Sequence, residues 1–210
     1  MSLYLIVAAV SYLLGSIPFG FLLVWLVRKE DIRTKGSGNI GATNVVRSGA
    51  KKLGLLTFVL DGGKGYAAVM VAELLARGKD PTTIRHLAVL AALLVILGHM
   101  FPAWLQFKGG KGVATAFGAF LALCPLAALA ALGVWLAVLA LTRYVSLASI
   151  LAAVVLPFFT LWLSPGRYGW AATVAVFVCC WSVIVKHHAN IVRLIQGTEH
   201  GFGASRKAGA

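Results

Sequence analysis

The sequence has few acidic residues, with 6 Asp and Glu among 210 residues. They are scattered, so no cluster of carboxylates could hold the Mg²⁺ that enzymatic phosphoryl transfer commonly uses. The chain also lacks a Gly-x-Ser-x-Gly nucleophile elbow, and no histidine is followed by an aspartate at the His-x4-Asp spacing. These absences argue against metal-assisted and serine-nucleophile chemistry, and we expect neither a metal nor a cofactor.

Cysteine is also scarce. Cys124, Cys179 and Cys180 all lie in apolar segments, and no spacing of Cys and His typical of a metal site occurs. We interpret the three residues as small buried hydrophobic side chains.

Apolar residues, by contrast, make up 60% of the chain, and the mean hydropathy is +0.90. Apolar stretches recur at close to the ~20 residues that an α-helix needs to cross a bilayer. The sequence therefore predicts an all-α, polytopic integral membrane protein with one domain over residues 1–210. The seven expected hydrophobic segments are Leu3–Val27, Leu53–Ala76, Leu87–Phe107, Gly112–Leu123, Pro125–Leu141, Val145–Leu163 and Tyr168–Val185.

The fourth segment, Gly112–Leu123, is short. A helix of this length measures about 18 Å, against a hydrocarbon core of about 30 Å. It is either a short helix that meets a thinned or polar region, or half of a re-entrant hairpin with the fifth segment. Polar or helix-breaking residues also interrupt the first segment at Gly15–Gly20 and the second at Asp61–Gly65. We expect broken helices that line a cavity at both places.

The basic residues are unevenly distributed between the connections. If all seven segments cross the membrane with the N-terminus outside, fourteen of the 19 Lys and Arg residues lie on the cytoplasmic side and four lie outside. The positive-inside rule then favours an N-out, C-in orientation. Because these connections account for the net charge of +13, we expect no nucleic-acid partner. No obligate protein partner is evident either.

The most polar stretch is a glycine-rich, basic loop at Asp31–Arg47. Glycines allow consecutive backbone N–H groups to point at one spot, and such nests flanked by cations bind phosphate. The stretch therefore predicts a loop that handles a phosphorylated small molecule. Its candidate ligands are Gly36, Ser37, Gly38, Asn39, Thr43, Asn44 and Arg47.

A second cluster rich in glycine and lysine precedes the fourth segment. It comprises Lys108, Gly109, Gly110, Lys111 and Gly112, with His99 upstream. N–H groups at the start of a helix, together with two lysines, favour a second phosphate site. The pattern is not a Walker A loop, because a glycine follows the second lysine. Ordinary positive-inside anchoring is the alternative for both lysines.

A third polar cluster follows the last segment. His187, Asn190 and Arg193 recur at intervals of three, which places them close to one face of a helix leaving the membrane. They are candidate substrate ligands, and a plain juxtamembrane helix is the alternative. Ser146, in the turn after the fifth segment, either adds a hydroxyl to the same site or caps a helix.

Lys64 lies inside the second hydrophobic segment, three residues after Asp61. A charged side chain at this depth is costly and is often functional. Lys64 either pairs with Asp61 on the helix surface or contacts substrate.

Together these residues resemble the bacterial integral-membrane, acyl-phosphate-dependent glycerol-3-phosphate acyltransferases of the PlsY type. The resemblance covers nearly the whole chain and depends on the order and spacing of several short motifs. They are Gly15–Gly20, Asp31–Arg47, Leu60–Gly65, Gly98–Pro102, Phe107–Thr115 and His187–Glu199.

The resemblance implies acyl transfer from an acyl phosphate to the sn-1 hydroxyl of glycerol 3-phosphate. The products are lysophosphatidic acid and phosphate, at the first step of bacterial phospholipid synthesis in the cytoplasmic membrane. The partners would be the bilayer and these two substrates. A transporter of organic phosphate is the competing interpretation, since broken helices and basic glycine motifs fit it too. The motifs, however, all lie in connections on one side.

The expected roles divide the motifs between the two substrates, and the two assignments are exchangeable. The donor head would be held by Ser37, Gly38, Asn39, Thr43, Asn44 and Arg47. Glycerol 3-phosphate would be held by Lys108, Lys111, His187, Asn190 and Arg193. The catalytic candidates are Ser37, Arg47, Lys108, His187 and Asn190. The base is His187, His99 or a phosphate oxygen of a substrate.

Overall fold

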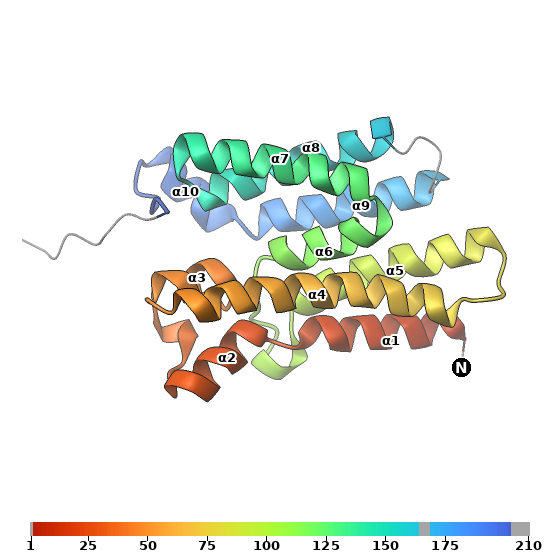
Figure 1. The fold of residues 1–210 in the computed structure, drawn as a ribbon, viewed down its shortest axis with the longest axis horizontal. Coiled ribbons are helices and arrows are strands. Elements are labelled where there is room, and N and C mark those ends of the chain that lie inside the picture. Colours follow the sequence, from red (N-terminus) through yellow and green to blue (C-terminus); the bar gives the residue numbers. More distant parts are fainter. Residues whose placement is uncertain (1, 164–168, 203–210) are drawn as a thin grey trace, which may run out of the picture.

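The structure is a computed structural model, and it describes residues 2–163 and 169–202 (Figure 1). Within these residues every regular element is a helix, as the composition predicts. The elements are α1 (Leu3–Ser16), α2 (Phe19–Arg28), η1 (Ile32–Thr34), α3 (Ala42–Arg47), α4 (Lys51–Leu75), α5 (Pro81–Met100), η2 (Ala103–Leu105), α6 (Val113–Leu123), α7 (Pro125–Thr142), α8 (Val145–Leu163), α9 (Gly169–Val185) and α10 (His188–Ile195).

Each predicted hydrophobic segment contains a helix, and Tyr168, where the seventh segment was expected to begin, lies outside the described residues. The helix of the third predicted segment, α5, begins earlier than expected, at Pro81. The Asp80 carboxylate accepts hydrogen bonds from the N–H groups of Thr82 and Thr83, both at 3.0 Å. This N-cap, followed by proline at the first helical position, starts the helix in a polar stretch that hydropathy alone does not mark.

The expected break in the first segment is confirmed. α1 ends at Ser16 and α2 begins at Phe19. Proline at position 18 has no N–H to donate, and it disfavours the helical conformation for the residue before it. Ile17 accordingly adopts an extended conformation, with ψ of 114°.

The expected break at Asp61–Gly65 is wrong, because α4 runs without interruption from Lys51 to Leu75. The glycines there serve close helix packing. A Cβ atom on Gly65 would collide with the carbonyl oxygen of Thr115 on α6, and one on Gly118 would collide with the carbonyl oxygen of Gly62. Small residues at both faces let the backbones of α4 and α6 approach closely, as in membrane helix pairs.

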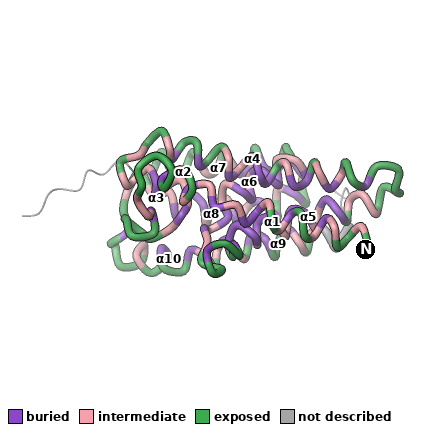
Figure 2. The backbone as a smooth tube through the Cα atoms, turned by 90° about the horizontal axis from the view of Figure 1, so that it is seen from below, coloured by how far each residue is buried: buried purple, intermediate pink, exposed green. Residues whose placement is uncertain are grey.

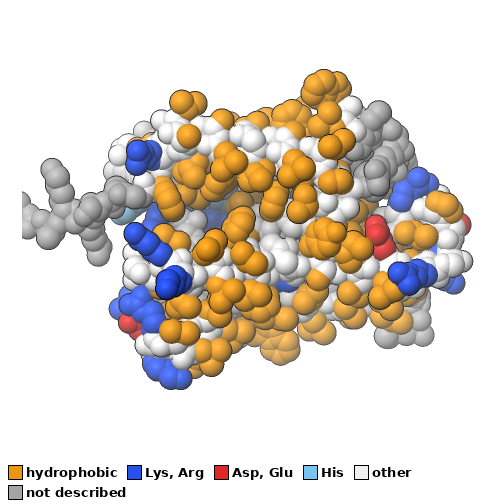
Figure 3. All heavy atoms as spheres, in the orientation of Figure 1, with side chains coloured by type: hydrophobic (Ala, Val, Ile, Leu, Met, Phe, Trp, Pro, Cys, Tyr) orange, Lys and Arg blue, Asp and Glu red, His pale blue; other side chains and the backbone are white. Residues whose placement is uncertain are grey.

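Among the described residues, five helical stretches are long and apolar enough to span a membrane, and α9 and α10, bent by 55°, make a sixth if they form one span. At 1.5 Å per residue, α6 is about 16 Å long. The count of seven crossings therefore stays a prediction, as does the orientation. Hydrophobic side chains cover the middle of one face of the molecule, while Lys and Arg gather toward its two ends (Figure 3).

The long helices lie side by side along the long axis, with α6 between α4 on one side and α7, α8 and α9 on the other (Figure 1). The buried residues concentrate where these helices meet (Figure 2). Phe120 of α6 is among the largest buried side chains there, at 1% exposure. The short helices α2, α3 and α10 gather at the end of the molecule away from the N-terminus, and they bring the polar motifs together.

Candidate active site

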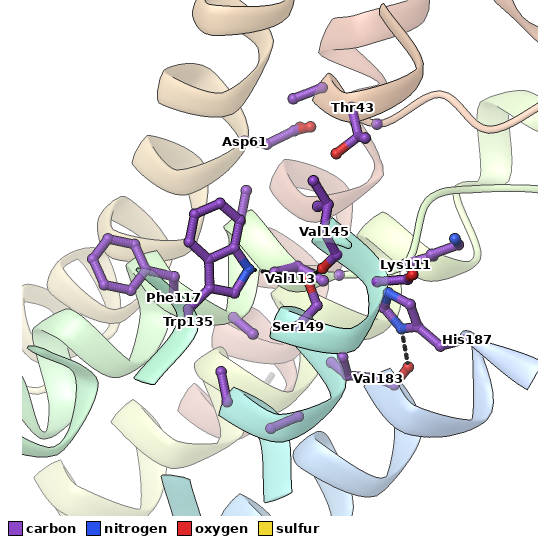
Figure 4. A pocket seen from close by; sticks show the side chains of 18 of the residues that line it. Thr43, Asp61, Lys111, Val113, Phe117, Trp135, Val145, Ser149, Val183 and His187 are labelled. Atoms are coloured by element: carbon purple, nitrogen blue, oxygen red, sulfur yellow. Dashed lines mark hydrogen bonds between the residues drawn. The ribbon is translucent and has the colours of Figure 1, made fainter. Parts of the chain in front are cut away.

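A cavity of about 200 Å³ lies where the polar motifs meet the long helices. One part of its wall is polar and comes from the loop before α3, the turn before α6, and α10. The other part is apolar and comes from α6, α7 and α8. Figure 4 shows Lys111 and His187 next to each other in this cavity, with Trp135 and Phe117 farther along the apolar wall.

Asn44 shapes the glycine-rich loop. Its amide nitrogen donates to the carbonyl oxygens of Ile32, Lys35 and Asn39 at 3.2, 3.0 and 2.7 Å. Its amide oxygen accepts from the N–H of Ser37 at 2.9 Å. The side chain is thus fully engaged within the loop, so Asn44 positions Ser37 in the cavity wall.

Gly36 and Gly38 make the turns that this arrangement needs. Their φ angles are +55° and +71°, in the left-handed region that glycine adopts without strain. Asn39 tightens the same loop, because its side-chain oxygen accepts from the N–H of Gly41 at 2.8 Å.

Glu199 is the centre of the polar wall, and its side chain is 2% exposed. It accepts from Ser146 Oγ at 3.0 Å, from Asn190 Nδ2 at 2.8 Å and from Arg193 Nε at 2.8 Å. Burial by itself would raise the pKa of Glu199. The hydrogen bonds from Arg193, Asn190 and Ser146 outweigh burial and hold this pKa below its usual range. The carboxylate is therefore the ionised anchor that joins α8, α10 and the C-terminal tail.

Arg47 approaches the same carboxylate from α3. Its Nη2 atom lies 4.0 Å from Glu199 Oε1 and donates to the carbonyl oxygen of His200 at 2.9 Å. Its Nε atom is buried and makes no hydrogen bond within the described residues. A buried guanidinium N–H with no acceptor is costly, and an anion in the cavity would satisfy it.

Lys111 completes a cluster of three cations around one carboxylate. Its ammonium group donates to Asn190 Oδ1. Burial, together with the nearby charges of Arg193 and Arg47, lowers the pKa of Lys111 to about 8 against the opposing effect of Glu199. Because a single carboxylate faces three cations, the polar wall has excess positive charge and is suited to an anionic ligand.

His187 is buried at the start of α10, at 3% exposure. Its Nδ1 atom lies 2.8 Å from the carbonyl oxygen of Val183. A carbonyl can only accept, so we assign the proton to Nδ1, which leaves Nε2 of the neutral ring as an acceptor. The predicted shared face of the third motif is confirmed for Asn190 and Arg193, because both contact Glu199.

The structure brings most of the predicted residues to the cavity. Eleven of them line it: Ser37, Asn39, Thr43, Asn44, Arg47, His99, Lys111, Gly112, Ser146, His187 and Asn190. Seven do not belong to the cavity wall as the described residues define it: Gly36, Gly38, Lys64, Lys108, Gly109, Gly110 and Arg193.

These seven residues have other surroundings. Lys108 is exposed, and Arg193 acts on the site through Glu199. Lys64 pairs with Asp61, with 2.8 Å between Nζ and Oδ1. Its Nζ also donates to a backbone carbonyl at the break between α1 and α2, so pairing, rather than an open substrate contact, describes its side chain.

Sequence reasoning missed two parts of the cavity. Glu199 appeared only within a motif, although its position in the third cluster and the rarity of acids in this chain were available signals. Trp135 of the apolar wall was not singled out. Trp135 Nε1 donates to Ser149 Oγ at 3.1 Å, which fixes the indole ring in place (Figure 4). No local pattern marks a tryptophan in an apolar helix as a cavity residue.

Comparison with known proteins identifies the family of this chain. The family model described as glycerol-3-phosphate acyltransferase matches residues 5–197. The chain belongs to the glycerol-3-phosphate acyltransferase family. It is therefore an acyltransferase, and it is an integral membrane protein.

Relatives match over nearly their full length. A glycerol-3-phosphate acyltransferase of Mesorhizobium japonicum is 49% identical over 207 residues, which is 97% of this chain and 99% of that protein. One of Rhodospirillum rubrum is 46% identical over 204 residues, which is 96% of this chain and 92% of that protein.

Solved structures show the same fold. The crystal structure of PlsY (YgiH), an integral membrane glycerol 3-phosphate acyltransferase, in its glycerol 3-phosphate form superposes with a TM-score of 0.85. It is 40% identical in sequence, and the match covers 95% of this chain and 96% of that chain. The lysophosphatidic acid form of PlsY gives a TM-score of 0.82 at 40% identity, with 95% of each chain covered.

The lowered pKa of Lys111 generates a testable pH dependence for this acyltransferase. With a pKa of about 8, the ammonium is mostly charged well below this pH in the free protein and mostly neutral well above it. If the phosphate of one substrate binds Lys111, the apparent KM for that substrate should rise with pH. The rise should be about tenfold at one pH unit above this pKa. Steady-state kinetics between about pH 7 and about pH 9.5 would measure this rise.

Lys111→Arg is the matched control, because arginine keeps its charge throughout this range. Its KM should be nearly independent of pH, whatever its absolute value. Parallel profiles for the wild-type protein and the arginine variant would show that Lys111 is not the titrating group.

Proposed function

We propose that this acyltransferase moves an acyl group from an acyl phosphate to the sn-1 hydroxyl of glycerol 3-phosphate and releases lysophosphatidic acid and phosphate. The observation that supports this proposal is the two-sided cavity. Its polar wall carries excess positive charge at Arg47 and Lys111, and its apolar wall runs along α6, α7 and α8. An acyl phosphate has the same two halves, an anionic head and a hydrocarbon tail.

The donor fits the side of the cavity formed by the glycine-rich loop. The Arg47 guanidinium and the Ser37 hydroxyl would hold the phosphate, with Arg47 Nε finding there the acceptor that it lacks within the protein. The tail would lie against Phe117, Phe120 and Trp135. Burying this tail contributes roughly 0.8 kcal/mol per methylene, so the apolar wall supplies affinity and the polar wall supplies orientation.

The acceptor fits the adjoining part of the polar wall, which the turn before α6 and the start of α10 form. Lys111, His187 and Asn190 lie together there, with Asn190 held between Lys111 and Glu199. We assign Lys111 to the phosphate of glycerol 3-phosphate and His187 Nε2 to its sn-1 hydroxyl. The glycerol 3-phosphate and lysophosphatidic acid forms described for PlsY, a relative of the same fold, support a site for these two molecules.

The protein has mainly to position the two substrates and to neutralise the charge of the leaving phosphate. The sn-1 oxygen attacks the acyl carbonyl carbon, the bond from this carbon to the phosphate oxygen breaks, and phosphate leaves. An acyl phosphate is a mixed anhydride with a good leaving group, so holding the reactants together and neutralising the leaving phosphate can supply much of the rate enhancement. His187 Nε2 accepts the proton of the hydroxyl, and the proton then passes to the departing phosphate.

We place the protein in the bacterial cytoplasmic membrane, with the cavity mouth on the cytoplasmic side. The positive-inside count supports this orientation, and the polar motifs gather at one end of the helices (Figure 1). Glycerol 3-phosphate would then enter from water, and the acyl donor would enter from the bilayer.

Purified protein given palmitoyl phosphate and glycerol 3-phosphate, with chelator present, should release phosphate only when both substrates are present. A colorimetric phosphate assay with product detection by mass spectrometry would measure the reaction. Arg47→Met should lose about 10²–10³-fold in turnover, as expected for a donor to developing charge. Lys52→Met, at an exposed basic residue of α4, is the control and should stay active. Strict dependence on acyl-CoA would contradict the proposed donor.

His187→Ala should lower kcat by about 10²–10⁴-fold at saturating substrate if Nε2 takes the hydroxyl proton. Stopped-time assays with both substrates in excess would give kcat. His188→Ala, at the exposed neighbouring histidine, is the matched control and should keep its turnover. A change in KM alone for His187→Ala would mean that a substrate phosphate oxygen takes the proton directly.

A further inference from the structure

A buried polar network lies next to the cavity, and the roles assigned above leave it unused. Asp61 and Lys64 of α4 are 2% and 3% exposed, and His99 near the end of α5 is 4% exposed. Charged side chains within membrane-spanning helices are costly to insert. Asp61 and His99 also line the cavity, and Figure 4 shows Asp61 across from Thr43 of α3.

Lys64 connects this network to the break in the first segment. Its Nζ atom lies 2.8 Å from Asp61 Oδ1, donates to the carbonyl oxygen of Ile17 at 2.8 Å, and lies 5.6 Å from the centre of the Phe19 ring. The ammonium group therefore balances the Asp61 carboxylate and satisfies a carbonyl at the point where α1 ends.

His99 connects the network to the turn that carries Lys111. Gly110 N–H donates to the carbonyl oxygen of His99 at 3.0 Å, and Gly109 N–H donates to that of Met100 at 3.2 Å. A Cβ atom on Gly110 would collide with the His99 ring itself. The imidazole is thus the surface on which the backbone of the 108–112 turn rests.

Asp61 faces this imidazole. Its Oδ1 atom lies 3.6 Å from His99 Nδ1, which is too long for a hydrogen bond. Asp61 Oδ1 is held by the Lys64 ammonium at 2.8 Å, whereas His99 Nδ1 has no hydrogen-bond partner in the described chain. A buried ring nitrogen left without such a partner needs an explanation beyond stability. At 3.6 Å the negative charge of Asp61 attracts a proton on His99 Nδ1, and this attraction favours one tautomer and one orientation of the ring.

We propose that Asp61 and His99 are positioning residues, which set the place of the 108–112 turn and thereby aim Lys111 at the phosphate of the acceptor. Asp61 orients the His99 ring, and the ring supports the turn at Gly110. Lys64 supplies the balancing charge and ties this support to the α1–α2 break. The inference rests on the proposed function in one respect, because it takes Lys111 to bind glycerol 3-phosphate.

A double substitution separates positioning from a purely structural ion pair. Removing one member of a buried pair strands a charge, whereas replacing both members by neutral groups of similar volume is often nearly neutral for stability. The variant Asp61→Asn with Lys64→Met should therefore keep its thermal unfolding midpoint within about 5 °C of wild type. Its KM for glycerol 3-phosphate should nevertheless rise by roughly 10–100-fold, as for other residues that orient a ligand-binding side chain.

The matched control is Lys79→Met with Asp80→Asn, at the opposite end of the molecule. It removes the same two charges from exposed positions, and asparagine can still cap α5. Its KM should equal that of wild type. His99→Gln, which leaves the ion pair intact, should raise KM by a similar factor as the double variant, and combining the two should add little further, because they act through one support.

A stable double variant with wild-type KM would overturn the inference, and so would a wild-type KM for His99→Gln. If the double variant fails to fold, the His99→Gln result decides. The proposed function has its own contradicting outcome. If the wild-type protein transfers no acyl group from palmitoyl phosphate, the proposed function is wrong. Calorimetric binding of glycerol 3-phosphate to the wild type and the variants would then test the positioning role by itself.

Discussion

The buried carboxylate of Glu199 is the interaction on which the candidate site depends. Arg47, Lys111 and Arg193 come from three separate parts of the chain, and like charges this close repel one another strongly in a poorly solvated cavity. Glu199 contacts Arg193 and Asn190 directly, lies 4.0 Å from Arg47, and reaches Lys111 through Asn190. One carboxylate is enough to hold the three cations together, and it leaves a positive excess that a phosphate group can neutralise.

The irregular parts of the fold supply the space for this cluster. The break at Pro18 frees a carbonyl group that Lys64 satisfies, and the glycine contacts between α4 and α6 draw these two helices together. Because α6 is short, the turn before it, which carries Lys111, lies beside α10. A long helix at this place would carry the turn away from α10. The apolar walls of α7 and α8 continue from there, so the charged end and the hydrocarbon-lined end belong to one cavity.

The sequence was a good guide wherever chemistry is local. Glycine, serine, asparagine and lysine within short motifs predicted the loop before α3 and the turn before α6, and Pro18 predicted the helix break. The sequence did not predict features that depend on contacts between residues far apart in the chain. The run at Asp61–Gly65 resembles a helix break, yet α4 stays continuous because its glycines pack against α6. The role of Glu199 depends on contacts to Ser146 and Arg47 that no spacing rule encodes.

The most direct test of the two-sided cavity is an experimental structure of the protein with glycerol 3-phosphate and a non-hydrolysable acyl phosphonate. The account predicts the phosphonate between Ser37 and Arg47, the glycerol phosphate at Lys111, and the alkyl chain along α6 and α7 past Trp135. A phosphonate bound away from both Arg47 and Lys111, or an alkyl chain outside the cavity, would contradict it.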